Sequence, residues 1–244
     1  LGDVYKRQAL AHADQATAQA RQIGDASLEA RALSQRGAIL IRTGDYDGAQ
    51  LGLETALDLA TTADDAKTSA ECLYRLGHCA LAHQDYTAAT RHYASALETY
   101  QTLHDRRGEI NCRLMLGVVY RRQGRHEVAS ASYQQALIMA QDIGWKYGQA
   151  DLLAHMGNHS LDLGDLEAAT RFHRQALKMC QEIGDREGEA LSLDSLGLVA
   201  YAEGKLDEAR RRCDEALAIQ RAIGYRRGEG YALTHLGQVL IDLG

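Results

Sequence analysis

The amino-acid sequence repeats with a period of 40 residues and without a single insertion, which is its most constraining feature. Glycine returns at Gly37, Gly77, Gly117, Gly157, Gly197 and Gly237. Alanine returns at Ala9, Ala49, Ala89, Ala129, Ala169 and Ala209, and again seven residues after each of these. A period of this length predicts a stack of like supersecondary units, each of which buries its apolar face against its neighbours.

One repeat is predicted to be a pair of helices. Over residues 187–203, apolar residues step by three and four, the spacing of one helix face, at Ala190, Leu193, Leu196 and Ala200. Gly204 ends this first helix, and acidic residues then begin a second helix that Gly224 closes. The repeat is therefore helix, turn, helix, turn.

Gly197 lies in the middle of the first helix, where glycine costs about 1 kcal/mol relative to alanine. The same cost recurs in every repeat. We therefore expect the second helix to approach closely at this point, with its alanine column facing the glycine.

Along the whole chain, the register predicts an all-α protein of about twelve helices. A half repeat spans 9–25 with a helix near 9–23, five full helix pairs span 26–225, and a half repeat spans 226–244 with a helix over 227–243. The absence of proline agrees with this. Residues 1–8 break the register, so we expect a non-native lead there, and we expect the array to be truncated at both ends.

The repeat resembles the tetratricopeptide repeat (TPR) family. The residues that carry the resemblance are Leu196-Gly197 in the first helix and Ala209, Cys213 and Ala216 in the second. The longer unit, which runs on through Ile-Gly-Asp-Arg-Glu-Gly-Glu-Ala at 183–190, is similar to the 40-residue subclass found in spindle-orientation adaptors and bacterial multidomain signalling regulators. The resemblance implies a right-handed superhelical solenoid whose first helices line a concave groove that binds a peptide or a partner helix.

The register then identifies candidate residues for this groove. They project from the first helix of each pair: Arg31, Tyr74, His78, Asn111, Arg113, Leu114, Arg121, Arg122, Asn158, Asp194, Tyr201, Tyr231 and Gln238. The family's chaperone-tail binders use groove lysines and its spindle adaptors use an asparagine ladder. This groove has no lysine and only two asparagines, so neither of those ligands is expected.

Arginines gather in the third repeat, at Arg106, Arg107, Arg113, Arg121, Arg122 and Arg125. One interpretation is that they are solvated or paired with neighbouring acids such as Glu71, Glu109 and Asp151, with the stem of Arg113 lying over the core. The other is that Arg113, Arg121 and Arg122 bind carboxylates or phosphates of a partner segment.

The sequence contains no strong pattern of catalytic or metal-binding residues, so no catalytic residue, metal or cofactor is expected. His155 and His159 have the spacing of a metal-binding pair, but they belong to different columns and are expected to diverge. His159 and Ser160 stand in apolar columns, and His173 replaces an aromatic residue, so we expect buried, hydrogen-bonded groups there. The cysteines are interpreted as core residues, and no phosphate-binding loop is present.

The composition sets the functional class. A net charge of −6 gives no electrostatic reason to expect nucleic acid or an anionic membrane as partner. Five cysteines without a paired motif and the lack of a secretory signal favour the cytoplasm. We expect a non-enzymatic scaffold or sensor arm of a larger bacterial signalling protein, binding a protein or peptide with an acidic segment. The alternatives are a regulatory region of an enzyme, such as a nucleotidyl cyclase or ATPase regulator, and a spacer that self-associates through uncapped ends.

Overall fold

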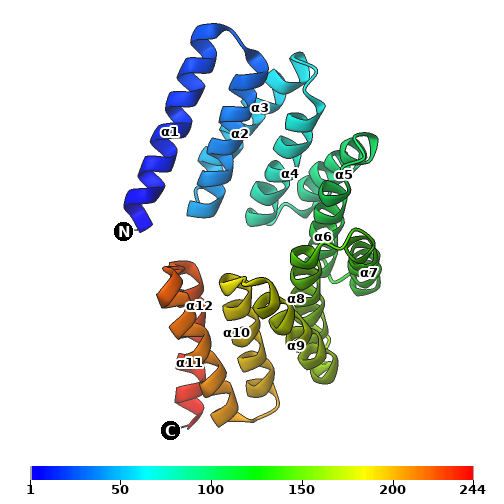
Figure 1. The fold of residues 1–244 in the computed structure, drawn as a ribbon. Helices are drawn as coiled ribbons and strands as arrows, with labels where there is room; N and C mark the ends of the chain where they lie inside the picture. The colour runs from blue at the N-terminus through cyan, green and yellow to red at the C-terminus, as the bar shows by residue number, and fades with distance from the viewer. Residues whose placement is uncertain (1, 244) are drawn as a thin grey trace. The chain divides into compact units, whose positions relative to one another are not determined.

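The computed structural model of the protein describes residues 2–243. In this part of the chain there are twelve α-helices and no strand, and within α1 to α6 and within α7 to α12 successive helices run antiparallel (Figure 1). The helices are α1 (Gly2–Ile23), α2 (Ala26–Thr43), α3 (Tyr46–Thr62), α4 (Ala66–Ala82), α5 (Tyr86–Thr102), α6 (Arg106–Arg122), α7 (His126–Asp142), α8 (Lys146–Asp162), α9 (Leu166–Ile183), α10 (Arg186–Ala202), α11 (Leu206–Ile223) and α12 (Arg226–Leu243). The prediction of an all-α chain of helix pairs is confirmed.

Residues at the turns explain where the helices begin and end. Gly44 adopts a left-handed conformation with φ of 85°, and its N–H donates to carbonyls of the last turn of α2. The next residue, Asp45, accepts a hydrogen bond from the N–H of Gly48 at 2.9 Å and so caps α3. Left-handed glycines and capping aspartates recur at most of the turns along the array.

The mid-helix glycines are points of close helix approach, as predicted. A Cβ added to Gly37, Gly77 or Gly157 would lie 2.5 to 2.7 Å from a side chain of the following helix. The facing column was predicted wrongly, however. It contains Leu53, Tyr93, His173 and Cys213 rather than the alanines, although the carbonyl of Ala209 also lies 3.3 Å from such a Cβ on Gly197. Glycine is needed because a bulky side chain fills the space that its own Cβ would take.

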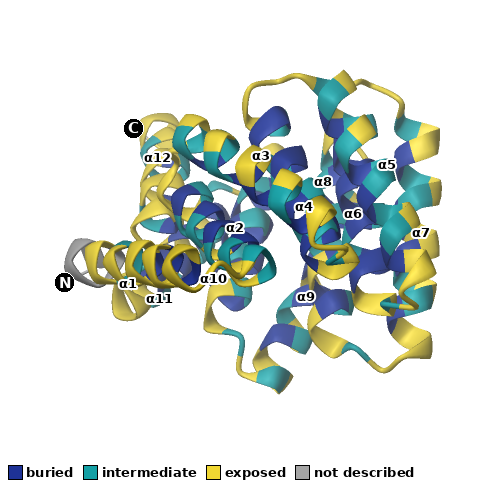
Figure 2. Ribbon diagram, turned by 90° about the horizontal axis from the view of Figure 1, so that it is seen from above, coloured by how far each residue is buried: buried dark blue, intermediate teal, exposed yellow. Residues whose placement is uncertain are grey.

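The chain divides into two compact units, Leu1–Arg125 and His126–Gly244. Within the first unit, Leu33, Leu40, Leu53 and Leu76 form a core with Cys72 and Cys79. Within the second unit, Val239 packs with Ala200 and Ala209. Figure 2 shows that buried residues lie on the helix faces turned toward neighbouring helices. Each helix therefore contributes one face to the core, as a repeat array requires.

The first helix is longer than the sequence pattern predicts. Helix α1 begins at Gly2, whereas the register predicts a start near residue 9. The lead segment loses the register, yet it contains no proline, so the helix continues through it. Whether residues 1–8 are native stays a prediction, and the side chains of residues 1–6 and both terminal residues lie outside the described part of the chain.

Candidate functional site

In the first unit, Arg31 from α2 forms an ion pair with Asp65 at the start of α4, at 2.9 Å. Asp65 also accepts hydrogen bonds from the hydroxyls of Ser27 and Thr68 and from the N–H of Thr68. Burial works to raise the pKa of Asp65, but these hydrogen bonds and that from Arg31 outweigh it and hold the pKa well below its usual range. Arg31 therefore links two successive repeats while its own side chain stays exposed.

Tyr74 and His78 lie together on α4, with ring centroids 4.7 Å apart and planes perpendicular. Tyr93 from α5 contacts both, at 5.6 Å from Tyr74 and 5.7 Å from His78. Burial and the charge of Arg75 lower the pKa of His78 to about 4. The imidazole is thus neutral near pH 7, so this half-buried ring cluster can offer one hydrogen-bond donor, one acceptor and aromatic surface.

Arg75 is fixed between these elements. Its guanidinium donates to the hydroxyl of Ser34 on α2 at 2.8 Å and to the carboxylate of Glu71 at 3.1 Å. The guanidinium is therefore held by Ser34 and Glu71, and its charge acts on the His78 imidazole.

The predicted arginine-rich part of the groove is only partly exposed. Asn111, Arg113 and Arg121 are half-buried, Arg122 is exposed, and Leu114 is buried with 4% of its surface exposed. Arg106 faces the buried Glu109 at 3.7 Å, which agrees with the paired interpretation for that arginine. Arg125 lies over the ring of Tyr120 at 4.7 Å. Binding of a partner by Arg113, Arg121 and Arg122 stays a prediction.

In the second unit, the candidate residues on α10 also link helices. Asp194 is buried, and one carboxylate oxygen lies 2.9 Å from Nδ1 of His235 on α12. The hydroxyl of Tyr201 donates to Asp242. Tyr231 is 47% exposed and accepts a hydrogen bond from Nε of Arg227 at 3.2 Å. Asn158 is half-buried and Gln238 is exposed.

These links follow a rule that our sequence reasoning missed. Several join residues 41 positions apart, namely Ser34 with Arg75, Asp194 with His235 and Tyr201 with Asp242. This spacing is one residue longer than the 40-residue repeat. Each pair therefore joins a residue of one first helix to the residue that follows its equivalent in the next first helix. Polar pairs at this spacing were the signal in the sequence.

Histidines cluster between α7 and α8 in the second unit. His155 stacks on Tyr133 at 6.3 Å, His159 contacts the edge of the same ring at 5.9 Å, and His126 lies 5.4 Å from His159. The two α8 histidines therefore converge on one tyrosine, contrary to the predicted divergence. Among the described residues there is no group of three or more His, Cys, Asp or Glu side chains that could hold a metal ion.

His173 occupies the aromatic column as predicted and is fully buried against Gly157. The expected hydrogen bond is missing, since neither ring nitrogen has a partner within the described residues. Burial, with a smaller contribution from His155, lowers the pKa of His173 to about 4. Burial is thus the main reason that this imidazole is neutral near pH 7.

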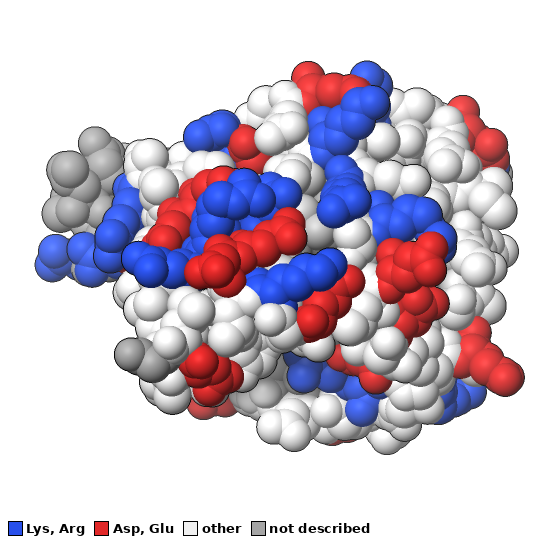
Figure 3. Space-filling model, turned by 90° about the horizontal axis from the view of Figure 1, so that it is seen from below, with Lys and Arg blue, Asp and Glu red and all other residues white. Residues whose placement is uncertain are grey.

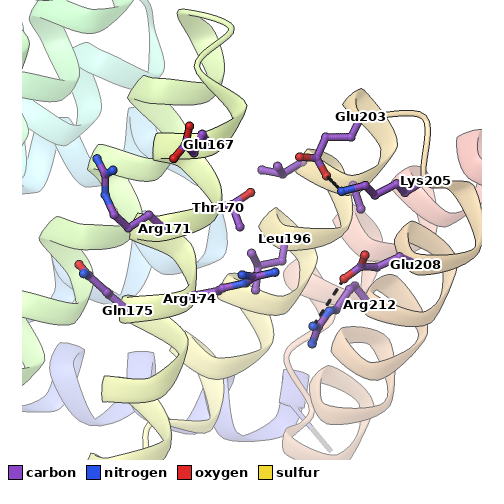
Figure 4. Close-up of a pocket in the computed structure, with 12 residues that line it drawn as sticks. Glu167, Thr170, Arg171, Arg174, Gln175, Leu196, Glu203, Lys205, Glu208 and Arg212 are labelled. Carbon is purple, nitrogen blue, oxygen red and sulfur yellow. Dashed lines mark hydrogen bonds and ion pairs between the residues drawn. The ribbon is translucent and has the colours of Figure 1, made fainter.

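Two hollows of the second unit occupy the same register one repeat apart. The first, of about 580 Å³, lies between α9 and α11 above α10 (Figure 4). The second, of about 640 Å³, lies between α7 and α9 above α8. Glu167, Val199 and Arg212 of the first correspond to Glu127, His159 and Phe172 of the second. The repeat thus forms similar hollows with different linings.

The hollow between α9 and α11 is lined by basic and acidic side chains in nearly equal number: Arg171, Arg174, Lys205 and Arg212 with Glu167, Glu203 and Glu208. Lys205 pairs with Glu203 at 2.8 Å and Arg212 faces Glu208 at 3.7 Å, while Arg174 projects from α9 (Figure 4). Figure 3 likewise shows acidic and basic side chains side by side over much of the face that it draws. No helix among the described residues combines the length and apolar character needed to cross a membrane.

Comparisons with solved structures show the fold. BtubC from P. vanneervenii matches with a TM-score of 0.71 and 19% identity, over 90% of this chain and 92% of that one. The Rap conjugation gene regulator of plasmid pLS20, solved in complex with the Phr* peptide, matches with a TM-score of 0.74 and 19% identity, over 89% of this chain and 63% of that one. A signal transduction ATPase with a tetratricopeptide repeat sensor from Pyrococcus horikoshii matches with a TM-score of 0.67 and 17% identity, over 90% of this chain but only 34% of that one.

No curated protein sequence matches the chain. The family model of the tetratricopeptide repeat, in contrast, matches residues 68–142 and 148–222, which together make up more than half of the sequence. The matched segments contain the Leu-Gly pairs and alanine columns on which the resemblance was based. The chain belongs to the tetratricopeptide repeat family.

Proposed function

We propose that this protein is a non-enzymatic interaction module that binds a peptide or a partner helix on the face of its first helices. The observation that carries the proposal is the cluster on α4, where the neutral, half-buried His78 lies against Tyr74 and the charge of the fixed Arg75 acts on its imidazole. Aromatic rings anchor binding partners well, because they bury a large area at little entropic cost.

The chemistry of the site indicates the kind of partner. An apolar or aromatic side chain would contact the Tyr74 ring, and a carboxylate of the partner would lie near the guanidinium of Arg31 or Arg75. In the third repeat, Arg121 and Arg122 would bind further carboxylates. The peptide complex of the Rap regulator, which shares the fold, supports a peptide as partner.

We further propose that the module works in the cytoplasm as the sensor or scaffold arm of a larger bacterial signalling protein. The repeat sensor of the Pyrococcus ATPase, which has the same fold within a longer chain, supports this arrangement. It would also fit a regulatory region whose catalytic domain lies outside this sequence. The flanking open reading frame would separate a scaffold protein from an enzyme regulator.

A displayed library of random peptides, selected on the immobilised protein, tests the binding site. We expect selected peptides to be rich in acidic and aromatic residues and to lose at least about tenfold in affinity for the Arg121→Glu/Arg122→Glu variant. The matched control is Arg210→Glu/Arg211→Glu, the same charge change on exposed residues of α11. Peptides that bind both variants equally, or no enriched peptides at all, would contradict the proposal.

A further inference from the structure

The hollow between α7 and α9 differs from the equivalent hollow between α9 and α11 at its rim. Three charged residues of the latter have uncharged equivalents in the former: Ala131 stands for Arg171, Leu163 for Glu203 and Phe172 for Arg212. In the hollow between α9 and α11, Glu203 and Arg212 pair with neighbouring charges, so that rim is complete in itself. In the hollow between α7 and α9, Leu163 is 54% exposed and Phe172 is half-buried, so the rim presents apolar surface to water.

The floor of the hollow between α7 and α9 changes in the opposite sense. His159 and Ser160 of α8, which are 6% and 8% exposed, stand where the neighbouring hollow has Val199 and Ala200. The neighbouring repeat packs with two apolar residues at these positions, so the packing of the array does not require polar ones. Burying a polar group costs free energy unless the group is hydrogen-bonded. The polar floor is therefore a specific feature of this hollow and not of the repeat.

The hollow has the size and the composition of a small-molecule site. Its volume of about 640 Å³ lies within the range of roughly 300 to 1,000 Å³ that is usual for such sites. Met156 of α8 and His126 of α7 also line it, and the ring of His126 lies 5.4 Å from that of His159. Small-molecule sites combine apolar and aromatic walls with a few convergent polar groups, and this hollow has both.

The charged residues that line the hollow favour a ligand without net charge. Glu127 and Asp165 contribute two carboxylates, and that of Asp165 caps α9 by accepting a hydrogen bond from the N–H of Ala168 at 2.9 Å. Arg171 contributes one guanidinium, which lies over the ring of Phe172 at 5.1 Å. An anionic ligand would face the two carboxylates and a cationic ligand would face the guanidinium, whereas an uncharged ligand avoids both repulsions.

We propose that this hollow binds an uncharged small molecule that has an aromatic ring and a hydroxyl or N–H group. The ring would contact Leu163, Phe172 and Met156, because aromatic and thioether side chains pack well against a flat ring. The polar group would form a hydrogen bond at the floor with the hydroxyl of Ser160, which can both donate and accept. Because its walls are second helices, this site is separate from the peptide site proposed on the first-helix face, and either proposal can fail without the other.

Nuclear magnetic resonance of the methionine methyl groups tests the proposal, because Met156 lines the hollow whereas Met115 lies in α6 of the other unit. The labelled protein is screened against a library of uncharged aromatic fragments that carry a hydroxyl or N–H group. We expect ring-current shifts of the Met156 signal and an unchanged signal from Met115. Met156→Leu assigns the signal, since Leu196 stands at the equivalent position. The O-methyl or N-methyl form of each bound fragment should bind at least about tenfold more weakly.

Two variants copy the neighbouring hollow and so introduce residues with which a repeat folds. Ser160→Ala should weaken the binding of a hydroxyl fragment at least about tenfold but leave the affinity of its methyl ether unchanged. Phe172→Arg should weaken both, because it replaces the apolar rim. Ser132→Ala is the matched control and should change neither affinity, since the hydroxyl of Ser132 donates to the carbonyl of Val128 within its own helix at 2.8 Å.

Circular dichroism checks that each variant folds. A screen in which no fragment shifts the Met156 signal would overturn the proposal, as would fragments that shift only the signals of other methionines. Fragments that bind Ser160→Ala as tightly as the wild type, or that bind equally well as methyl ethers, would overturn the hydrogen bond at the floor.

Discussion

The two units use different residues at the turns between helices, where the backbone adopts a positive φ. In the first unit, Asp64, Gln84 and His104 occupy turn positions with φ of 53° to 60°, where most repeats have glycine. In the second unit, glycine fills every such turn at Gly144, Gly164, Gly184, Gly204 and Gly224. The left-handed conformation costs a non-glycine residue about 1 kcal/mol or more. The fold therefore tolerates strained turns in one unit that the other avoids.

At the helix starts, it is the first unit that has the more favourable residues. In the first unit, α2 to α6 each begin with an aspartate whose side chain accepts a backbone hydrogen bond: Asp25, Asp45, Asp65, Asp85 and Asp105. In the second unit, Trp145 and Lys205 stand at two such positions and make no side-chain cap. Since a cap contributes about 1 kcal/mol, the two uncapped helix starts are the local weakness of the second unit, as the strained turns are that of the first. The register of the repeat, and not any single turn or cap, specifies the fold.

The largest expected effect tests the close approach of helices. Gly157→Leu should lower the free energy of unfolding by about 3 kcal/mol, because even the first added carbon would meet the ring of His173. Gly77→Leu should do the same in the first unit, against Tyr93. Urea denaturation measures both.

Gly237→Ala is the control for this comparison, because its added methyl group meets nothing. It should raise stability by up to about 1 kcal/mol through better helix propensity. If Gly157→Leu were neutral or stabilising, the assignment of the packed faces would be wrong.

The next effect concerns the buried imidazole of the second unit. The folded-state pKa of His173 is about 4, below the ordinary value of 6.5, so the unfolded chain binds a proton first as the pH falls. Stability should therefore be present above pH 6.5 and decline toward pH 4, with a loss of about 2 kcal/mol between pH 7 and pH 5.

His173→Phe should remove that part of the pH dependence, as measured by urea denaturation at both pH values. The pKa of His78 in the first unit is also about 4, so this residue still contributes to the pH dependence of stability in the variant and serves as the internal comparison. An unchanged slope in the phenylalanine variant would show that His173 is not the group responsible.

A smaller effect is expected at the strained turns. His104→Gly and Gln84→Gly should each raise stability by about 1 kcal/mol, because glycine adopts positive φ without a steric penalty. Gly184→His in the second unit should cause a loss of similar size. Thermal melts of the three variants and the wild type measure these changes in stability. Equal melting temperatures would mean that the turns do not store strain.

The smallest effect is expected at a missing cap. Lys205→Asp should stabilise α11 by about 0.5 to 1 kcal/mol, less whatever the exposed pair with Glu203 contributes. Asp165→Ala, which removes the cap of α9, should cost a similar amount. Thermal melts again provide the measurement, and a destabilised aspartate variant would contradict the capping argument.

Much of the fold was predictable from the sequence. The helix predicted over 187–203 is α10, Arg186–Ala202, because a 3.6-residue period bounded by Gly204 leaves little freedom. The start of α1 was not predictable from the register, since a helix can extend past it where no partner is needed. The column facing Gly157 was missed because the rotation of one helix about its axis depends on the crossing geometry, which residue spacing does not specify.

For the candidate site, the sequence predicted which positions lie on the first helices but not most of the contacts that their side chains make. Tyr74 and His78 lie together as neighbours on one helix face should. The pair of Asp194 with His235 was missed although its spacing of 41 residues was readable in the sequence, whereas the pair of Arg31 with Asp65, 34 residues apart, depends on how successive helices are offset and has no such signal. Several residues expected to contact a ligand thus also hold the repeats together.

The central claim is that the first-helix face binds the partner. Amide hydrogen exchange of the protein, measured with and without a peptide selected on it, tests this claim most directly. We predict slower exchange in α4, around Tyr74 and His78, with α3 and α5 unchanged. Protection confined to second helices, such as α9 and α11 around the hollow of Figure 4, would contradict the claim and place the binding site on the other face.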